Sequence, residues 1–267
     1  MTQKHLPYKL NHRVAVVTGA GRGLGKGITK ELVLKHKNTV LAVDLRRESV
    51  EQLAQNPELR NHIIPIPADL SKEEDVLRVC KTAREMGNVS VLINNAGITS
   101  FGPSDSHHMK LYRHIVNVNF SAAMDLTLSF LHLFQNQGEG RVLNVTSMGG
   151  VVPLAYQAVY TASKHALQGF TEALAAENQH PGIRICSFAP GGMATEMTEE
   201  SGLAHQFSGW HLQSPERAAK RAIKALQKGH VLSTACFADS LGLASMRFLP
   251  RHMACKTLAR LYKPKGQ

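Results

Sequence analysis

The side chains best suited to moving a proton are a tyrosine and a lysine four positions apart. Tyr160 and Lys164 lie in a segment whose pattern predicts a helix over residues 158–178, so their side chains share one face and can meet. At about 5 Å and an effective dielectric of about 20, a lysine ammonium stabilises a phenolate by roughly 3 kcal/mol, which lowers the tyrosine pKa by about two units. Tyr160 would then accept a proton from an alcohol or donate one to a carbonyl oxygen. Ser147, at the end of a predicted strand, would hydrogen-bond the same oxygen and hold it in place.

A glycine-rich segment at residues 18–25, TGAGRGLG, has the composition of a phosphate-binding turn. Glycines between a strand and a helix let the backbone turn tightly and approach a pyrophosphate, and the helix N-terminus then faces the anion. Asp44 ends the next predicted strand, where a carboxylate accepts hydrogen bonds from the adenosine ribose hydroxyls and repels the extra phosphate of NADP. The sequence therefore favours NAD. Nearby basic residues leave a second interpretation open, because they could hold a 2′-phosphate if Asp44 turned away, or be solvated surface charges. They are Arg22, Arg46 and Arg47.

Alternating strands and helices must position these residues. Short apolar, β-branched runs predict strands, and helical patterns lie between them. The predicted strands cover residues 13–18, 38–43, 63–67, 89–93, 140–146, 183–188 and 230–234. Such alternation is typical of βαβ units that wind right-handed into a parallel sheet covered on both faces. We expect an α/β fold, a single doubly wound Rossmann-type domain with a parallel sheet of about seven strands, and ligands beyond the carboxyl ends of those strands.

The composition argues against several classes of protein. The four cysteines form no CxxC pair and the fourteen histidines show no metal-binding spacing, so we expect no metal and a reducing, cytoplasmic location. The most apolar run, residues 121–134, is interrupted by Asp125 and His132, so no membrane span is predicted. The net charge of +11 is concentrated near the C-terminus. Nucleic-acid binding is not expected, because that basic segment lacks interleaved aromatic residues and a recognisable binding fold.

Three regions follow from these patterns. Residues 1–12 form an N-terminal extension, residues 13–235 form the dinucleotide-binding domain, and residues 236–267 form a basic amphipathic C-terminal segment. Three alternatives are open for the last region: peripheral contact with an anionic membrane, a helix that caps the substrate pocket with its apolar side, or a partly disordered tail. Within the domain, residues 190–213 are expected to form a substrate loop. Its apolar members indicate a lipophilic substrate: Met193, Met197, Leu203, Phe207 and Trp210.

Beyond local patterns, the chain resembles the short-chain dehydrogenase/reductase family over nearly its whole length. The turn at 18–25 fits the family's TGxxxGxG pattern, residues 94–97 fit NNAG, and residues 160–164 fit YxxxK. The resemblance implies a catalytic tetrad of Asn119, Ser147, Tyr160 and Lys164. It implies that Asn119 helps to hold a water linking the site to solvent, and that Lys164 also binds the nicotinamide ribose. The expected cofactor-binding residues are Gly19, Gly21, Arg22, Gly23, Leu24, Gly25, Asp44, Asp69, Leu70, Asn95, Ala96, Gly97, Tyr160, Lys164, Pro190, Gly191 and Thr195.

The function expected from these features is NAD(H)-dependent interconversion of a small-molecule alcohol and a ketone or aldehyde, with Tyr160 as general acid and base. A non-catalytic NAD-binding sensor or scaffold is the main alternative, although it has no need of a complete tetrad. A sugar-nucleotide epimerase or dehydratase is disfavoured by the glycine spacing and by the lack of a sizeable C-terminal substrate domain. A stripe of small residues on the helix at 158–178 favours a homodimer or homotetramer over ordinary intramolecular packing. The stripe consists of Ala158, Ala162, Ala166, Gly169 and Ala173.

Overall fold

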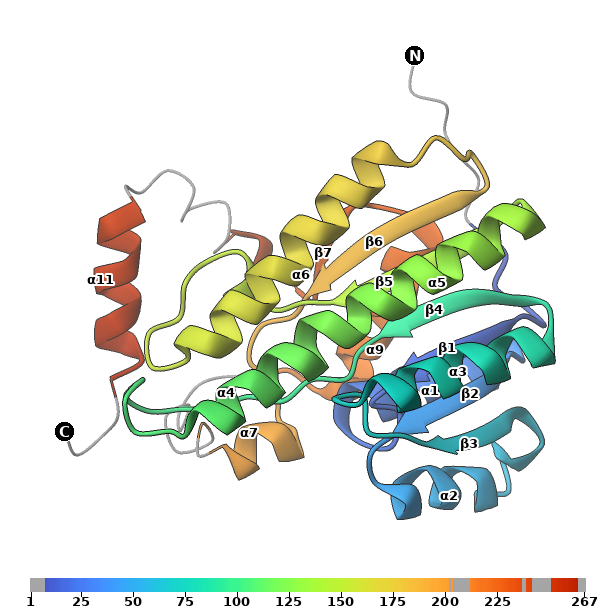
Figure 1. The fold of residues 1–267 in the computed structure, drawn as a ribbon, viewed down its shortest axis with the longest axis horizontal. Coiled ribbons are helices and arrows are strands. Elements are labelled where there is room, and N and C mark those ends of the chain that lie inside the picture. The colour runs from blue at the N-terminus through green and yellow to red at the C-terminus, as the bar shows by residue number, and fades with distance from the viewer. Residues whose placement is uncertain (1–7, 202, 204–211, 237–238, 242–250, 264–267) are drawn as a thin grey trace.

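A parallel β-sheet forms the middle layer of the protein (Figure 1). The computed structural model describes residues 8–201, 203, 212–236, 239–241 and 251–263. Its seven strands have the order β3-β2-β1-β4-β5-β6-β7, and every pairing is parallel. The strands are β1 Val14–Thr18, β2 Thr39–Asp44, β3 Ile63–Pro67, β4 Val89–Asn94, β5 Gly140–Val145, β6 Ile183–Ala189 and β7 Leu232–Thr234. The expected doubly wound Rossmann-type fold is therefore confirmed.

Helices cover both faces of the sheet. Helices α1, α2 and α9 pack on one face, and α3, α5 and α6 pack on the other. The bounds are α1 Gly23–His36, α2 Arg47–Gln55, α3 Glu73–Met86, α4 Met109–Val116, α5 Ala122–Gln137, α6 Ala158–Glu177, α7 Glu196–Glu200, α9 Pro215–Lys228 and α11 Arg251–Leu261. A π-helical turn at Asn117–Ser121 joins α4 to α5, and short 3₁₀ turns lie at Arg60–His62 and Met148–Gly150. Because both faces are covered, the central strands are almost entirely buried and read as continuous apolar runs.

Six of the seven strand ranges differ from the sequence prediction, four of them by a single residue at one end, and β2 and β7 differ by more. The second strand begins at Thr39 rather than at residue 38, because the backbone N–H of Asn38 donates to the carbonyl of Leu32 (3.1 Å) and so ends α1. The last strand covers only Leu232–Thr234 of the predicted 230–234. Parts of three predicted regions lie outside the described residues: residues 1–7, residues 204–211 with Phe207 and Trp210, and residues 242–250 and 264–267.

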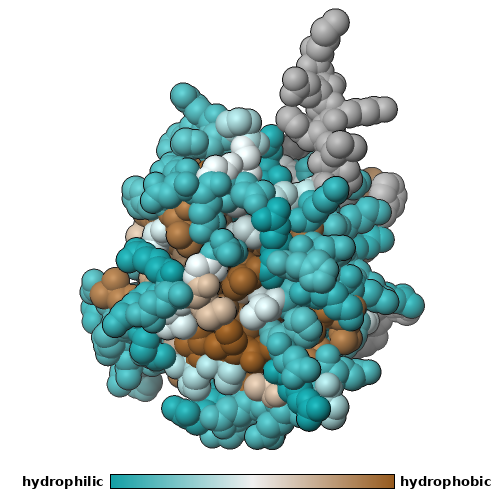
Figure 2. Space-filling view, turned by 90° about the vertical axis from the view of Figure 1, so that its right-hand side faces the viewer, coloured by the Kyte–Doolittle hydropathy of each residue, from teal (hydrophilic) through white to brown (hydrophobic). Residues whose placement is uncertain are grey.

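The strands end at the left in Figure 1, where α7 and α11 also lie. Figure 2 shows the opposite end, where the strands begin, and this face is mostly hydrophilic with hydrophobic side chains gathered near its middle. The chain runs from β1 outward to β2 and β3, and then returns to place β4 on the other side of β1. The direction of strand addition therefore reverses between β1 and β4. In sheets of this kind ligands bind at the carboxyl ends beside such a reversal. Within the described part of the chain, no helix has both the length and the hydropathy needed to span a bilayer.

Candidate active site

A pocket lies at the carboxyl ends of the strands, and it gathers most of the residues predicted from the sequence. The predicted residues that line it are Gly19, Arg22, Gly23, Leu24, Asp44, Asp69, Leu70, Asn95, Ala96, Gly97, Ser147, Tyr160, Lys164, Pro190, Gly191 and Thr195. Three predicted residues do not line it: Gly21, Gly25 and Asn119. These three lie behind the lining, where each supports a residue or turn that does reach the pocket.

The glycine turn needs its glycines for two physical reasons. Gly19 has a φ of +62°, which L side chains rarely adopt, and a Cβ there would lie 2.9 Å from the Cα of Ala96. A Cβ on Gly25 would lie 1.9 Å from the carbonyl oxygen of Gly19, because the turn folds back on the start of α1. The backbone therefore lies bare beside the pocket at the N-terminus of α1. This cradle fits the pyrophosphate of a dinucleotide, which such a turn binds by backbone N–H groups.

Asp44 is held in place by the backbone. Its Oδ2 accepts a hydrogen bond from Gly21 N (2.9 Å) and its Oδ1 accepts one from Arg46 N (3.0 Å). The residue is buried, yet it lines the pocket beside the glycine turn. The carboxylate is thus oriented toward the place where the sequence predicts the adenosine ribose. Gly21 does not line the pocket, but its backbone N–H helps to hold Asp44 in this orientation.

The segment after β4 is fastened to the glycine turn by Thr18, which the sequence analysis did not single out. The Thr18 hydroxyl accepts hydrogen bonds from Asn95 N and Ala96 N, each at 3.0 Å. The Asn95 side-chain amide donates in turn to the carbonyls of Thr18 (3.0 Å) and Gly19 (3.1 Å). Thr18 and Asn95 therefore act as positioning residues. A hydroxyl at the last residue of a strand, directly before a glycine turn, is the sequence signal that marks Thr18.

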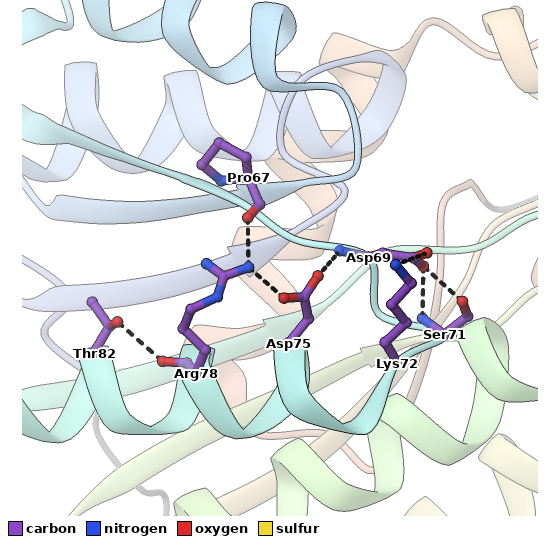
Figure 3. Close-up of polar contacts among 7 residues, drawn as sticks. All are labelled: Pro67, Asp69, Ser71, Lys72, Asp75, Arg78 and Thr82. Carbon is purple, nitrogen blue, oxygen red and sulfur yellow. Dashed lines mark hydrogen bonds and ion pairs between the residues drawn. The ribbon is translucent and has the colours of Figure 1, made fainter.

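The predicted adenine-side aspartate lies in a network with the first turns of α3 (Figure 3). Asp69 Oδ1 accepts from the backbone N (3.0 Å) and hydroxyl (2.7 Å) of Ser71, and these contacts lower the pKa of Asp69 against the opposing effect of burial. The backbone N of Asp69 donates to Asp75 Oδ2 (2.6 Å). Asp75 also accepts from Arg78 (2.5 Å), which donates to the carbonyl of Pro67 (2.9 Å). The end of β3 is thereby attached to α3.

Tyr160 and Ser147 form a hydrogen-bonded pair at the pocket. Ser147 Oγ also accepts from Gly149 N (3.0 Å), which orients the hydroxyl at the start of the turn Met148–Gly150. Burial raises the pKa of Tyr160 above its ordinary value of 10.0, and the hydrogen bond to Ser147 opposes this only in part. At neutral pH, Tyr160 is therefore a protonated phenol.

The predicted lowering of the Tyr160 pKa by Lys164 is wrong for this structure. Lys164 is buried, its Nζ donates to the carbonyl of Val145 (2.9 Å), and burial lowers its own pKa to about 8. Desolvation disfavours the charged forms of both side chains, and it outweighs the attraction between a phenolate and an ammonium. Lys164 still lines the pocket beside Tyr160, and its Nζ lies 3.3 Å from the place a Cβ on Gly97 would occupy.

Asn119 ties the segment after β4 to α6. It lies in the π-helical turn, fully buried, and its Oδ1 accepts from Ile98 N (2.8 Å). Its amide donates to the carbonyl of Ile98 (2.9 Å) and to Ser163 Oγ (3.0 Å), and Ser163 donates to the carbonyl of Tyr160 (2.7 Å). The side chain therefore supports the helix that carries Tyr160. A role in holding water stays a prediction.

One side of the pocket is apolar, and this is the side where we expect the substrate. Its lining includes Met148, Leu154, Met193, Met197, Leu203 and Tyr262. Tyr262 follows α11, and Leu258 of α11 is buried against Val152 and Leu154. Burial and the nearby Tyr160 raise the pKa of Tyr262 to about 12. Of the alternatives for the C-terminal segment, this placement agrees with a helix that covers the pocket, and membrane contact stays a prediction.

The sheet order, the glycine turn and the buried Asp44 define a class, the Rossmann-type dinucleotide-binding proteins. A family model described as short chain dehydrogenase matches residues 13–206. The chain therefore belongs to the short-chain dehydrogenase family. Membership of this family indicates an oxidoreductase that acts on a small molecule and uses a nicotinamide cofactor. Among the described residues, no group of His, Cys, Asp and Glu side chains is placed to hold a metal.

Relatives that are named for an activity are similar to this chain over most of their length. Ketoacyl reductase HetN from Nostoc sp. is 31% identical over 222 residues, which cover 82% of this chain and 76% of the relative. A 3-ketoacyl-(acyl-carrier-protein) reductase from Brucella melitensis, complexed with NADH, has a TM-score of 0.74 at 28% identity and covers 85% of this chain and 95% of its own. A short chain dehydrogenase from Burkholderia cenocepacia, in complex with NADP, has a TM-score of 0.79 at 25% identity, with coverage of 96% and 100%. Both forms of the cofactor thus occur among similar structures.

Proposed function

We propose that this protein is an NAD(H)-dependent oxidoreductase that interconverts a lipophilic alcohol and its ketone or aldehyde, with Tyr160 as general acid and base. The observation that carries the proposal is that Tyr160, Ser147 and Lys164 line the same pocket as the glycine turn and Asp44. A silent dinucleotide-binding protein has no physical need for a paired phenol and hydroxyl at that point.

The chain's own residues move the proton and hold the substrate oxygen. When bound, the nicotinamide cofactor would supply or accept the hydride. Tyr160, protonated at neutral pH, donates its proton to a carbonyl oxygen as that oxygen gains charge, and Ser147 hydrogen-bonds the same oxygen. In the oxidation direction Tyr160 must first lose its proton, so the rate of alcohol oxidation should rise with pH through the neutral and alkaline range.

The preference for NAD rests on Asp44. Its carboxylate is fixed by Gly21 N and Arg46 N, so it cannot turn away without breaking two hydrogen bonds. A carboxylate so held would bind ribose hydroxyls and repel a 2′-phosphate. The apolar lining around Met148, Leu154 and Tyr262 supports a lipophilic substrate.

The test is turnover of purified protein with a panel of lipophilic and polar alcohols and carbonyl compounds, followed by the absorbance of the reduced nicotinamide. Tyr160→Phe should lower kcat by about 100-fold to 10,000-fold. NAD affinity, measured by calorimetry, should change little, because the change removes one hydroxyl and leaves the ring. Tyr112→Phe is the matched control, since it removes a hydroxyl that bonds only the Ser104 carbonyl on the surface.

Two outcomes would contradict the proposal. Full turnover in Tyr160→Phe would remove Tyr160 from the proton-transfer role. Tight NAD binding with no turnover of any compound, in either direction, would favour the sensor or scaffold. The expected outcome is NAD-linked turnover that falls in Tyr160→Phe and is retained in Tyr112→Phe.

A further inference from the structure

One carboxylate joins two arginines beside the predicted ribose site. Glu200 Oε1 lies 2.7 Å from Arg22 Nη1 and 2.7 Å from Arg46 Nη2. Glu200 is the last residue of α7, while Arg22 belongs to the glycine turn and Arg46 follows β2. Three segments far apart in the sequence therefore meet through one side chain.

Residues at the start of α7 also lie close to the glycine turn. Thr195, directly before α7, has its Cγ2 3.2 Å from the place a Cβ on Gly23 would occupy, and Glu196 Oε2 lies 3.6 Å from the same place. Thr195 and Glu196 line the pocket together with Arg22 and Arg46. The acidic start and end of α7 thus border the phosphate turn and the end of β2.

Both arginines adjoin Asp44, the residue expected to meet the ribose. The backbone N of Arg46 donates to Asp44 Oδ1 (3.0 Å), and Arg22 follows Gly21, whose N donates to Asp44 Oδ2 (2.9 Å). A guanidinium binds carboxylate and phosphate oxygens by the same planar donor geometry. The two arginines that now bind Glu200 therefore have the chemistry of a 2′-phosphate site.

We propose that Glu200 sets the preference between NAD and NADP, because its carboxylate occupies the guanidinium groups of Arg22 and Arg46 and so disfavours a 2′-phosphate. The inference rests on the proposed function, in that it takes this pocket to bind a nicotinamide dinucleotide. It goes beyond Asp44, because it assigns discrimination to a residue of the predicted substrate loop.

The charge balance supports this role. Arg22 and Arg46 bring two positive charges, and Asp44, Glu196 and Glu200 bring three negative ones, so the group of five carries one net negative charge. Hydrogen bonds from Arg22 and then Arg46 hold the pKa of Glu200 below its ordinary value, so the carboxylate stays charged at neutral pH. Loss of the Glu200 charge leaves the group neutral and frees both guanidinium groups beside the expected ribose site. Because Glu200 and Arg46 are about half exposed and Arg22 about one quarter exposed, the expected effect is moderate.

The experiment measures the dissociation constants of NAD and NADP by calorimetry for the full-length protein and its variants. Glu200→Gln should tighten NADP binding by about threefold to tenfold, the size expected for releasing two partly exposed ion pairs, and should change NAD binding by less than about twofold. Glu199→Gln is the matched control. It removes the same charge from the adjacent residue, which is exposed and forms no ion pair within the described residues.

A second variant tests the mechanism. In Glu200→Gln combined with Arg46→Gln, the gain in NADP affinity should be smaller than in Glu200→Gln alone, because only one of the two freed guanidinium groups remains. The proposal is overturned if Glu200→Gln leaves the ratio of NADP to NAD affinity unchanged, if Glu199→Gln shifts the ratio equally, or if the gain is undiminished without Arg46.

The binding experiment separates this inference from the proposed function. It requires no turnover, so an inactive protein that still binds dinucleotides gives a valid ratio. If the unmodified protein prefers NADP, the proposed NAD preference fails, whereas the comparison of Glu200→Gln with the unmodified protein still decides the role of Glu200. If neither dinucleotide binds, both proposals are overturned.

Discussion

Burial governs the ionisation of Tyr160 and Lys164 in the candidate active site. Lys164 is 4% exposed, and its pKa is lowered from 10.5 to about 8 by burial. Between these two pH values the unfolded chain holds a proton that the folded chain has released. The free energy of unfolding therefore rises with pH between about pH 8 and pH 10.5, and Lys164 contributes roughly 3 kcal/mol to this rise. Below about pH 8 the buried ammonium destabilises the folded protein by this full amount. A buried ammonium is thus retained at a cost in stability.

Lys164→Met removes the buried charge and should change how stability depends on pH. The variant should gain most in unfolding free energy, relative to the unmodified protein, at pH 7. This gain should fall by up to about 3 kcal/mol toward pH 10. Urea denaturation at the two pH values measures it. Lys224→Met, an exposed lysine on α9, is the control. A difference that is independent of pH would show that Lys164 ionises normally.

Asp75 acts on the cofactor side through Asp69, although it does not line the pocket. Its carboxylate accepts from Asp69 N and from Arg78, and Arg78 is the main cause of its lowered pKa. Asp75→Asn keeps the side-chain shape and loses the ion pair, so the loop after β3 should loosen and NAD affinity should fall by about twofold to fivefold. Calorimetric titration with NAD checks this. Glu74→Gln, on the same turn of α3, should leave the affinity unchanged, and an equal loss there would contradict the argument.

At the scale of elements, α11 supplies part of the pocket from outside the region that matches the family. That match ends at residue 206, whereas Leu258 and Tyr262 lie well beyond it. Leu258 is buried against Val152 and Leu154, which follow the turn carrying Ser147 and precede α6. A helix docked at this point covers the apolar side of the pocket, which we expect to hold the substrate, while the glycine turn and Asp44 lie on the expected cofactor side.

Leu258→Ala should weaken the docking of α11 and raise KM for a lipophilic substrate by roughly tenfold, because the apolar wall around Tyr262 loosens. NAD affinity should not change, since Leu258 packs on Val152 and Leu154 at the apolar side of the pocket. Steady-state kinetics with substrates of increasing chain length measure the effect, which should be greatest for the longest. Met253→Ala, an exposed position on the same helix, is the control. An equal rise in KM for both variants would contradict the assigned wall.

At the scale of the whole molecule, α6 presents its small residues to solvent. The five stripe residues predicted from sequence are all exposed on the outer side of α6, while Leu167 and Thr171 face inward. The chain alone leaves this face uncovered, which excludes the alternative that the stripe packs within the described part of the subunit. We therefore predict a homo-oligomer built through α6, because small side chains let two helices approach closely.

Gly169→Glu should convert that oligomer to a smaller species. A Cβ on Gly169 would meet no heavy atom within 4 Å, so the subunit itself accommodates the side chain, and two buried glutamates would repel across an interface. Size-exclusion chromatography with light scattering measures the mass, and circular dichroism checks the fold. Gln52→Glu, on α2 at the other face of the sheet, should leave the mass unchanged. A monomeric unmodified protein would refute the prediction.

Local patterns by themselves determined the strands, the order of elements and the positions of the glycine turn, Asp44, Ser147 and the pair Tyr160 and Lys164. They do so because apolar periodicity and the conformational demands of glycine act over a few residues, and because a parallel sheet brings its strand ends to one edge. These are properties that can be read without knowing which segments meet.

Tertiary structure alone decided the ionisation of Tyr160 and Lys164, the attachment of Asn119 to Ile98, and the contacts of Glu200 and Tyr262. Glu200 lies 178 positions from Arg22 and 154 from Arg46, so no local pattern could pair them. Burial depends on every segment packed around a group, and it outweighed the single attraction that the sequence placed between Tyr160 and Lys164. The side chains that we propose to act on the cofactor and substrate ends come from segments that meet only when the chain is folded.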